Sequence, residues 1–301
     1  MDEEGLRSAL HRQGLGRVAE DLLAMAAPMV RIYAKPAEDE AIPIGASKLG
    51  GQPDLPEGVE WPAWHEPMGF LGQFNLAEVA PHDTEAALPT AGLLSFFFET
   101  DGEPLYSARW GLPDDAPYED DPAFDPSPGW RVLYHQGDPA TFVRREIPPD
   151  LNEFARYAPC AARFAAEITL PDVDGPEIAP LGLTTAERSA LINIELEVNK
   201  GTWKERGYHL LGYPINFGGA ALARCDEESR HLGYVWADAD AAQRLEIERD
   251  VATRWRLLLQ LDSSGDTGFD WAGGGVLHVC IECQALPRAD FSRVWLIMQS
   301  L

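Results

Sequence analysis

Two pairs of apolar segments, far apart in the chain, carry the same pattern and constrain the fold more than any other feature. Residues 70–76 (FLGQFNL) and 257–263 (LLLQLDS) share a glutamine that is followed by an apolar residue and then by Asn or Asp. Residues 92–99 and 275–282 come next in each case, and both start with glycine and continue as an apolar run. Short runs that are apolar on both faces are typical of strands buried on both sides. The repeated order therefore predicts two related β-rich units that pack their apolar faces into one core, with Gln73 and Gln260 at equivalent positions.

The rest of the chain indicates an α+β fold that is mainly β, with flanking helices. The 27 glycines and 24 prolines fit frequent turns between short strands. Further strands are expected at 29–35, 130–135, 141–147, 163–170, 255–261 and 294–299. Helices are expected at 3–26 (broken near Gly14 and Gly16), 150–161, 184–198 and 238–253. The helix at 184–198 begins with a capping box formed by Thr184 and Glu187.

These segments predict a domain organisation in two parts. Residues 1–28 form an N-terminal helical segment, and residues 29–301 form the main domain. Within the main domain, the first β-unit spans about 44–147 and the second about 205–301, with a helical connection between them.

The net charge of −25 excludes several classes of partner. Such a surface repels phosphate backbones and anionic lipid headgroups, so we expect neither nucleic-acid nor membrane binding. A partner with a basic patch is compatible with it. Six acidic residues and five prolines fall within residues 113–128, which predicts an exposed acidic loop.

The N-terminus and the cysteines indicate a cytoplasmic protein. The first residues, MDEEGLRSAL, are acidic, no apolar signal-peptide core follows, and no run reaches the ~20 apolar residues of a membrane span. Cys280 and Cys283 lie in a strand-like run that separates their side chains onto opposite faces. Cys160 and Cys225 stand alone, so we expect buried, reduced thiols with a structural role and no zinc site.

No linear motif marks a catalytic centre. The sequence has no G-x-S-x-G, Walker A, H-E-x-x-H or G-x-G-x-x-G motif, so we assign no catalytic residues, metal or cofactor. The loop that contains Asp262, Asp266 and Asp270 can be read in two ways. Its carboxylates can chelate a hard cation, or they can cap the backbone of a solvated turn.

A groove between two glycine loops is the expected place for any ligand. Gly50–Gly51 and Gly273–Gly275 adjoin strand ends in the two units, and glycine lets a ligand approach the backbone closely. The alternative is that these glycines only serve turns. The candidate ligand-binding residues are Trp61, Gln73, Gln260, Asp262, Asp266, Asp270 and Trp271.

The same segments resemble the YwqG-like family, a bacterial domain of unknown function. The matching residues are Ser47–Gly51 with Pro53, Pro56, Gly58, Trp61–Pro62, Phe70–Leu71, Gln73, Asn75–Leu76, Leu88–Pro89, Gly92–Leu94, Phe96–Phe97, Leu257–Ser263, Asp290–Ser292 and Val294–Trp295. The resemblance covers nearly the whole chain and implies a mostly β fold with flanking helices. It brings no catalytic residues. Family members tend to place an acidic residue in the glycine turn after Trp271, and this chain has Ala272–Gly275 there.

Three functional hypotheses remain open at this point. The first is a non-enzymatic binding or interaction protein, for example with an immunity or antitoxin role, steered to a basic protein partner by its charge. The second is a hydrolase that uses carboxylates such as Asp262, Asp266 or Asp270. The third is a small-ligand-binding protein with its site between the two repeats.

Overall fold

The structure is a computed structural model of the 301-residue chain. It describes residues 1–64, 66–99, 129–200, 207–216, 220–230, 235–263 and 266–300. The acidic loop predicted at 113–128 lies outside the described residues.

Within the described ranges, ten strands form one antiparallel sheet. Their order is β12-β11-β10-β9-β1-β8-β2-β4-β5-β6. The strands are β1 (Ala27–Pro36), β2 (Lys48–Leu49), β4 (Gly69–Asn75), β5 (Leu93–Phe98), β6 (Trp130–His135), β8 (Cys160–Thr169), β9 (His209–Leu210), β10 (Trp255–Asp262), β11 (Val276–Glu282) and β12 (Val294–Gln299). β3 (Asp54–Leu55) and β7 (Val143–Arg144) pair separately. The mainly β class is confirmed.

The long pair β1–β8 lies at the centre of the strand order. It runs in register over ten residues, from Ala27 opposite Thr169 to Pro36 opposite Cys160. On each side of this pair comes a two-residue strand, then a longer strand with a register shift, then two more strands. The shift falls just before Gly72 in β4 and just before Leu259 in β10.

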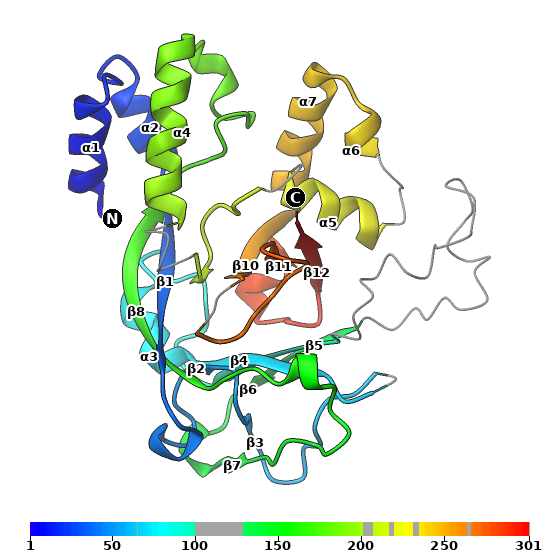
Figure 1. The fold of residues 1–301 in the computed structure, drawn as a ribbon. Coiled ribbons are helices and arrows are strands. Elements are labelled where there is room, and N and C mark those ends of the chain that lie inside the picture. Colours follow the sequence, from blue (N-terminus) through cyan, green and yellow to red (C-terminus); the bar gives the residue numbers. More distant parts are fainter. Residues whose placement is uncertain are drawn as a thin grey trace.

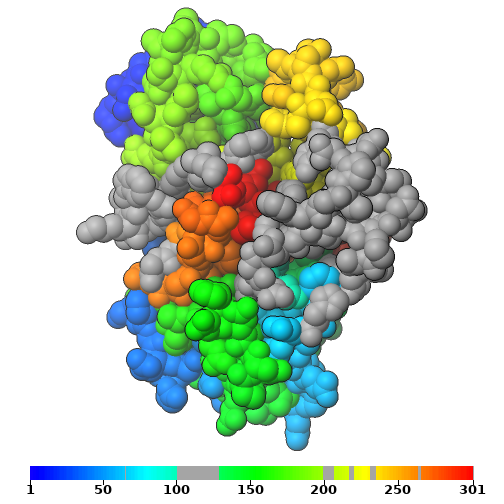
Figure 2. Space-filling view, turned by 45° about the vertical axis from the view of Figure 1, so that its right-hand side comes forward, coloured from blue at the N-terminus to red at the C-terminus, as the bar shows by residue number. Residues whose placement is uncertain are grey.

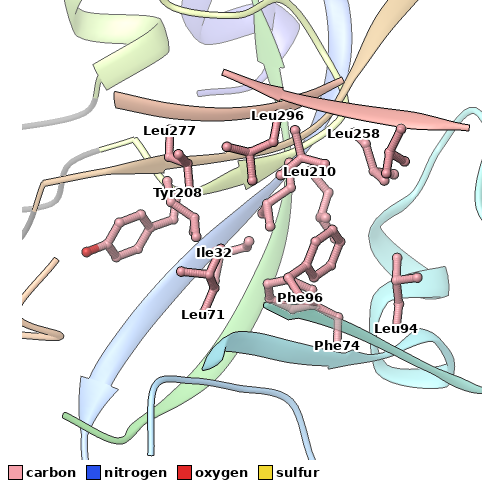
Figure 3. Close-up of a cluster of buried hydrophobic side chains, with 14 of the residues drawn as sticks. Ile32, Leu71, Phe74, Leu94, Phe96, Tyr208, Leu210, Leu258, Leu277 and Leu296 are labelled. Atoms are coloured by element: carbon pink, nitrogen blue, oxygen red, sulfur yellow. The ribbon is translucent and has the colours of Figure 1, made fainter. Parts of the chain in front are cut away.

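The main core lies where the sheet folds over on itself. Figure 3 shows leucines of β9–β12 facing Leu71, Phe74, Leu94 and Phe96 of β4 and β5, with Ile32 of β1 between them. One cross-strand row of this core is Val30, Leu210, Leu259, Val279 and Leu296. Cross-strand partners share a face of a sheet, so these apolar rows cover the inner face and bury it.

Two groups of helices stand above the strands (Figure 1). One group consists of α1 (Glu3–Arg12), α2 (Ala19–Met25) and α4 (Thr185–Lys200), which build a separate apolar cluster with the end of β8. The other consists of α5 (Ala221–Ser229), α6 (Val235–Asp238) and α7 (Ala241–Ala252). The short α3 (Leu76–Val79) follows β4. None of these helices, within the described ranges, has the length and apolarity needed to cross a membrane.

The C-terminal part of the chain reaches the surface near the middle of the molecule in Figure 2. The orange surface of the C-terminal part lies between the green helical region above and the blue and green segments below (Figure 2). Figure 1 likewise places β10, β11 and β12 between the helices above and β2, β4, β5 and β6 below.

Several predicted elements are confirmed and two are corrected. The capping box of α4 forms, because Thr184 Oγ1 accepts from the Glu187 N–H at 3.3 Å and Glu187 accepts from the Thr184 N–H at 2.9 Å. The helix predicted at 150–161 is wrong, since only a 3-10 turn at Glu153–Ala155 forms there and β8 begins at Cys160. Pro159 disfavours helix in the residue before it, and the Tyr157 carbonyl instead accepts from Gly51 N–H at 2.9 Å.

The second correction concerns the strand predicted at 141–147. Only its two-residue centre, β7, pairs, and it pairs with β3 outside the main sheet.

Candidate functional site

Gln73 is a buried clamp between β4 and the chain around β2. Its Oε1 accepts from the Asp54 N–H at 2.8 Å, and its Nε2 donates to the Ala46 carbonyl at 2.9 Å. Nε2 also donates to Asp54 Oδ2 at 2.7 Å. Since the side chain is fully buried, these bonds replace the water that its amide would otherwise bind.

Gln260 is a second clamp of the same kind in β10. Its Oε1 accepts from the Ile215 N–H at 2.8 Å, and its Nε2 donates to the Gly207 carbonyl at 3.1 Å. Gln73 pairs with Lys48 of β2, and Gln260 pairs with His209 of β9. In both cases the carbonyl lies two residues before that partner and the N–H six residues after it.

A buried polar row runs beside the apolar rows in both halves of the sheet. In one half the row is Lys48, Gln73 and Ser95, and in the other it is Arg31, His209, Gln260 and His278. All seven side chains are buried. Arg31 donates from Nη2 to the Val198 carbonyl of α4 at 2.7 Å, so α4 helps to cover this face.

A pocket of about 460 Å³ opens where the two outer strands of the sheet approach each other. Trp130 comes from β6 and Trp295 from β12, and their ring centroids are 4.8 Å apart in an edge-to-face arrangement. The other residues that line the pocket are Asp226, Ser229, Arg230, Arg254, Trp255, Glu282, Gln284, Ser292, Arg293 and Val294. We call this space the seam pocket, because it lies on the seam between the two edges of the sheet.

Asp226 organises one wall of the seam pocket. It lies on α5, is 4% exposed, and accepts from Arg254 Nε at 3.0 Å and Nη2 at 2.9 Å. It also accepts from Arg230 Nη1 at 3.0 Å and from Trp255 Nε1 at 3.2 Å. Burial by itself raises the pKa of the Asp226 carboxyl, but the hydrogen bonds and charges of Arg254 and Arg230 outweigh it and hold the pKa below its usual range. Asp226 is therefore an ionised anchor for two arginines.

The rest of the pocket wall is polar and charged. Arg293 Nη2 lies 2.6 Å from Glu282 Oε1, and both side chains are partly exposed. Arg254 contacts Asp250 as well as Asp226. Its hydrogen bonds to these two carboxylates raise the pKa of its guanidinium above the ordinary value. Sequence reasoning missed this site, because its residues are dispersed over α5, β10, β11, β12 and β6 and carry no motif.

A comparison with models of protein families shows which family the chain belongs to. The family model described as "Domain of unknown function (DUF1963)" matches residues 47–300. The chain belongs to the DUF1963 family. None of the curated proteins compared with it matches the chain. The resemblance to the YwqG-like family stays a prediction. The DUF1963 match begins after β1, although β1 lies in the middle of the strand order.

None of the ligand-binding residues predicted for this DUF1963 chain is among the residues that line the seam pocket, and their role stays a prediction. Trp61 is half-buried and donates from Nε1 to the Met68 carbonyl at 2.8 Å. Trp271 and Asp262 are buried, whereas Asp266 and Asp270 are exposed. Gln73 and Gln260 are the clamps described above.

One aspartate of the loop caps a turn, as the turn interpretation expects, while cation binding by this loop stays a prediction. Asp270 Oδ1 accepts from the Gly273 N–H at 2.9 Å, which is the capping of a turn by its own aspartate. In the described part of the chain, no cluster of three or more His, Cys, Asp or Glu side chains is placed to hold a metal ion.

A cluster of aromatic rings connects the chain beside Gly50 with the chain before Gly273. Tyr157 and Ala158 lie beside Gly50, and the ring centroid of Tyr157 lies 4.6 Å from that of Phe269 and 6.0 Å from that of Trp271. Gly50 has φ +60°, and a Cβ there would lie 2.3 Å from the Ala158 carbonyl oxygen. The loop at Gly50 thus uses glycine for its own turn and for close packing.

A second charged cluster of the DUF1963 domain lies beside Gln73. Lys48 is fully buried and its Nζ lies 2.8 Å from Asp39 Oδ1, while Arg144 Nε lies 2.9 Å from the buried Asp54 Oδ1. Burial lowers the pKa of Lys48, and the hydrogen bond to Asp39 opposes that shift. Because each charge has an opposite partner, this cluster fastens the segment from Asp39 to Leu55 onto the sheet.

The four cysteines are free thiols. Cys160, Cys225 and Cys280 are buried, and Cys283 is half-buried just beyond β11. Burial raises the pKa of the Cys160 thiol to about 11, with a smaller contribution from the charge of Asp266. A thiol of this kind is protonated at neutral pH, which suits a structural role.

Proposed function

We propose that this DUF1963 protein is a non-enzymatic binding protein whose ligand site is the seam pocket. The observation that carries the proposal is a pocket of about 460 Å³ that both halves of the sheet line, Trp130 from one outer strand and Trp295 from the other. A volume of this size suits a small molecule or a few residues of a peptide.

The state of the pocket carboxylates supports binding over catalysis. A general acid or base needs a pKa near the working pH and a free path to the substrate. Asp226 instead accepts four hydrogen bonds and has a lowered pKa, and Glu282 pairs with Arg293. Both groups are better suited to holding arginines in place.

A matched pair of variants at Ser229 tests the pocket. Ser229 lines the pocket at the end of α5, where its Oγ donates to the Asp226 carbonyl at 3.1 Å. Ser229→Trp places a large ring in the pocket, and Ser229→Ala leaves the space open. We expect ligand-observed NMR with small aromatic fragments to show binders of the wild type and Ser229→Ala that Ser229→Trp no longer binds. Fragments that bind all three proteins equally, or the absence of any binder, would count against the proposal.

We further propose that the two halves arose by internal duplication. Three matches support it: the strand order on either side of β1–β8, the register shift two residues before each glutamine clamp, and the equivalent partners of the two clamps. The turns after β2 and β9 also match. Gly50 and Gly51 have φ +60° and +70°, and Leu211 and Gly212 have +62° and +73°.

We also keep the proposal of a cytoplasmic protein with a basic protein partner, for example in an immunity role. Four free thiols, three of them buried, suit a reducing compartment, and the net charge of −25 would steer a basic partner toward the protein. The test is capture of a purified basic partner candidate at low and high salt, where loss of binding at high salt is expected.

The hydrolase alternative remains a prediction that Asp262→Ala and Asp270→Ala would test.

A further inference from the structure

We propose that the seam pocket selects a ligand that carries an oxyanion, a carboxylate or a phosphate, attached to an aromatic ring. This inference rests on the proposed function, because it names the chemistry of the ligand of that same pocket. It follows from how the arginines are held and from what lies beside them.

One carboxylate oxygen brings two guanidinium groups together. Asp226 Oδ2 accepts from Arg254 Nη2 at 2.9 Å and from Arg230 Nη1 at 3.0 Å. Asp226 is 4% exposed, so its position is fixed by the packing of α5 against β10 and β12. Two like charges are therefore held within a few ångströms of each other at the pocket wall, in an arrangement that a second anion would stabilise.

The arginines keep donors for such an anion. A guanidinium has five N–H donors in a planar fork. Arg230 contacts Asp226 through Nη1, and its side chain is 52% exposed, so its Nε and Nη2 can reach a ligand. Arg293 donates from Nη2 to Glu282 and is 59% exposed. Bidentate pairing of these forks suits the oxygens of a carboxylate or a phosphate.

The charges that line the pocket are nearly balanced, whereas acidic residues far outnumber basic ones in the whole chain. Arg230, Arg254 and Arg293 line it together with two carboxylates, Asp226 and Glu282, while the chain carries a net charge of −25. Asp250 beyond the wall contacts Arg254 as well. Arg230 and Arg293 are the more exposed arginines of the wall, at 52% and 59%, and their guanidinium donors suit an anionic ligand better than a cationic one.

The tryptophans supply the flat apolar part of the site. Trp130, Trp255 and Trp295 line the pocket, and the Nε1 atoms of Trp255 and Trp295 are fixed by Asp226 and Glu228. Trp130 and Trp255 are buried in the pocket wall, and the partly exposed Trp295 offers ring surface to an aromatic ring of the ligand. The oxyanion and the ring would thus be recognised side by side.

The experiment is calorimetric titration of the full chain with five probes: phenyl phosphate, benzoate, phenol, inorganic phosphate and benzylamine. We expect phenyl phosphate or benzoate to bind at least about tenfold more tightly than phenol, inorganic phosphate and benzylamine, because only the first two engage the arginines and the tryptophans together. Comparing phenyl phosphate with benzoate shows whether the pocket prefers a phosphate or a carboxylate.

Arg230→Ala and Arg17→Ala form a matched pair for this test. Both arginines are about half exposed and ion-paired, at 52% and 56%, but Arg17 pairs with Glu187 in the other group of helices. We expect Arg230→Ala to weaken the oxyanion probe by about tenfold and Arg17→Ala to leave it unchanged.

Distinct results overturn distinct claims. If benzylamine or phenol binds as tightly as the oxyanion probes and Ser229→Trp blocks it, the pocket binds ligands but the inference about the oxyanion is wrong. If inorganic phosphate alone binds as tightly as phenyl phosphate, the requirement for a ring is wrong. If Arg230→Ala and Arg17→Ala weaken binding of the oxyanion probe equally, or if none of the probes binds, the assignment of the pocket arginines to ligand binding is wrong.

Discussion

At the scale of single residues, the fold depends on polar side chains that are buried and satisfied. Gln73 joins the main sheet to the chain at Ala46 and at Asp54 of β3, and Gln260 joins it to the chain at Gly207 and Ile215. A glutamine amide offers both a donor and an acceptor, so one side chain can satisfy a backbone N–H and a backbone C=O together. An apolar residue of similar size would leave both backbone groups unpaired in a site that water does not reach.

Replacing either clamp is expected to destabilise the protein by a similar amount. Gln73→Leu and Gln260→Leu each leave a buried N–H and C=O without partners, which costs about 2–4 kcal/mol of the free energy of unfolding. Urea denaturation of each variant measures it. The exposed Gln136→Leu is the control, and it should change the stability by less than about 0.5 kcal/mol. Clamp variants as stable as this control would disprove the role.

Two buried histidines make the stability depend on pH. Burial lowers the pKa of His209 to about 3, helped by the charge of Arg31, and lowers that of His278 to about 4. Their hydrogen bonds to the carbonyls of Leu211 and Ile215 oppose these shifts. The unfolded chain therefore binds protons more readily than the folded one below the ordinary pKa of about 6.5.

We expect the full free energy of unfolding above about pH 6.5 and a decrease as the pH falls toward the pKa values of the two histidines in the folded protein. Between pH 7 and pH 5, one such histidine accounts for a loss of about 2 kcal/mol. His278→Gln should therefore lose about 2 kcal/mol less than the wild type over this range, as measured by denaturation at the two values of pH. Equal losses in the two proteins would show that His278 is not neutral and buried.

At the scale of elements, the central pair β1–β8 connects the two halves of the sheet. β1 pairs with β8 on one side and with β9 on the other. Among the described strands, β1 is therefore the only one that joins the strands β9 to β12 to β8. The DUF1963 match begins at residue 47 and leaves β1 out. A family boundary taken from sequence thus cuts through the physical sheet.

A chain that starts at residue 47 is expected not to fold. Without β1, the edges of β8 and β9 lose their partners, and Val30 and Ile32 leave the core. Circular dichroism with thermal unfolding of residues 47–301 against the full chain measures this. Cooperative unfolding of the truncated chain near the melting temperature of the full chain would contradict it.

The elements that the sequence predicted well are those whose signal is local. The apolar runs of β4, β5, β10 and β11 and the capping box of α4 can be read from neighbouring residues. β9 has two residues, which is too few for any periodic pattern. The predicted helix at 150–161 does not form, because Pro159 disfavours helix in the residue before it and the Tyr157 carbonyl accepts from the Gly51 N–H instead of from a helical N–H. The seam pocket could not be predicted, since it exists only once β6 and β12 approach across the molecule.

At the scale of the whole molecule, the ten-stranded sheet folds over until its two edges nearly meet. An edge strand exposes unpaired backbone groups that invite unwanted pairing. Here α5 packs against β12, and rings bridge the edges, Trp130 to Trp295 and Tyr134 to Phe291, with centroids 4.8 and 5.2 Å apart. The seam is therefore closed by side chains instead of ladder hydrogen bonds, and this arrangement leaves room for a pocket.

The contact of Trp130 with Trp295 is the most direct test of this account, because both the seam and its pocket depend on it. A double-mutant cycle with Trp130→Leu, Trp295→Leu and the double variant, followed by urea denaturation, measures the coupling free energy between the two rings. We predict a coupling of about 1 kcal/mol, as for other edge-to-face aromatic pairs. Effects that add to within about 0.3 kcal/mol would mean that the two edges do not meet.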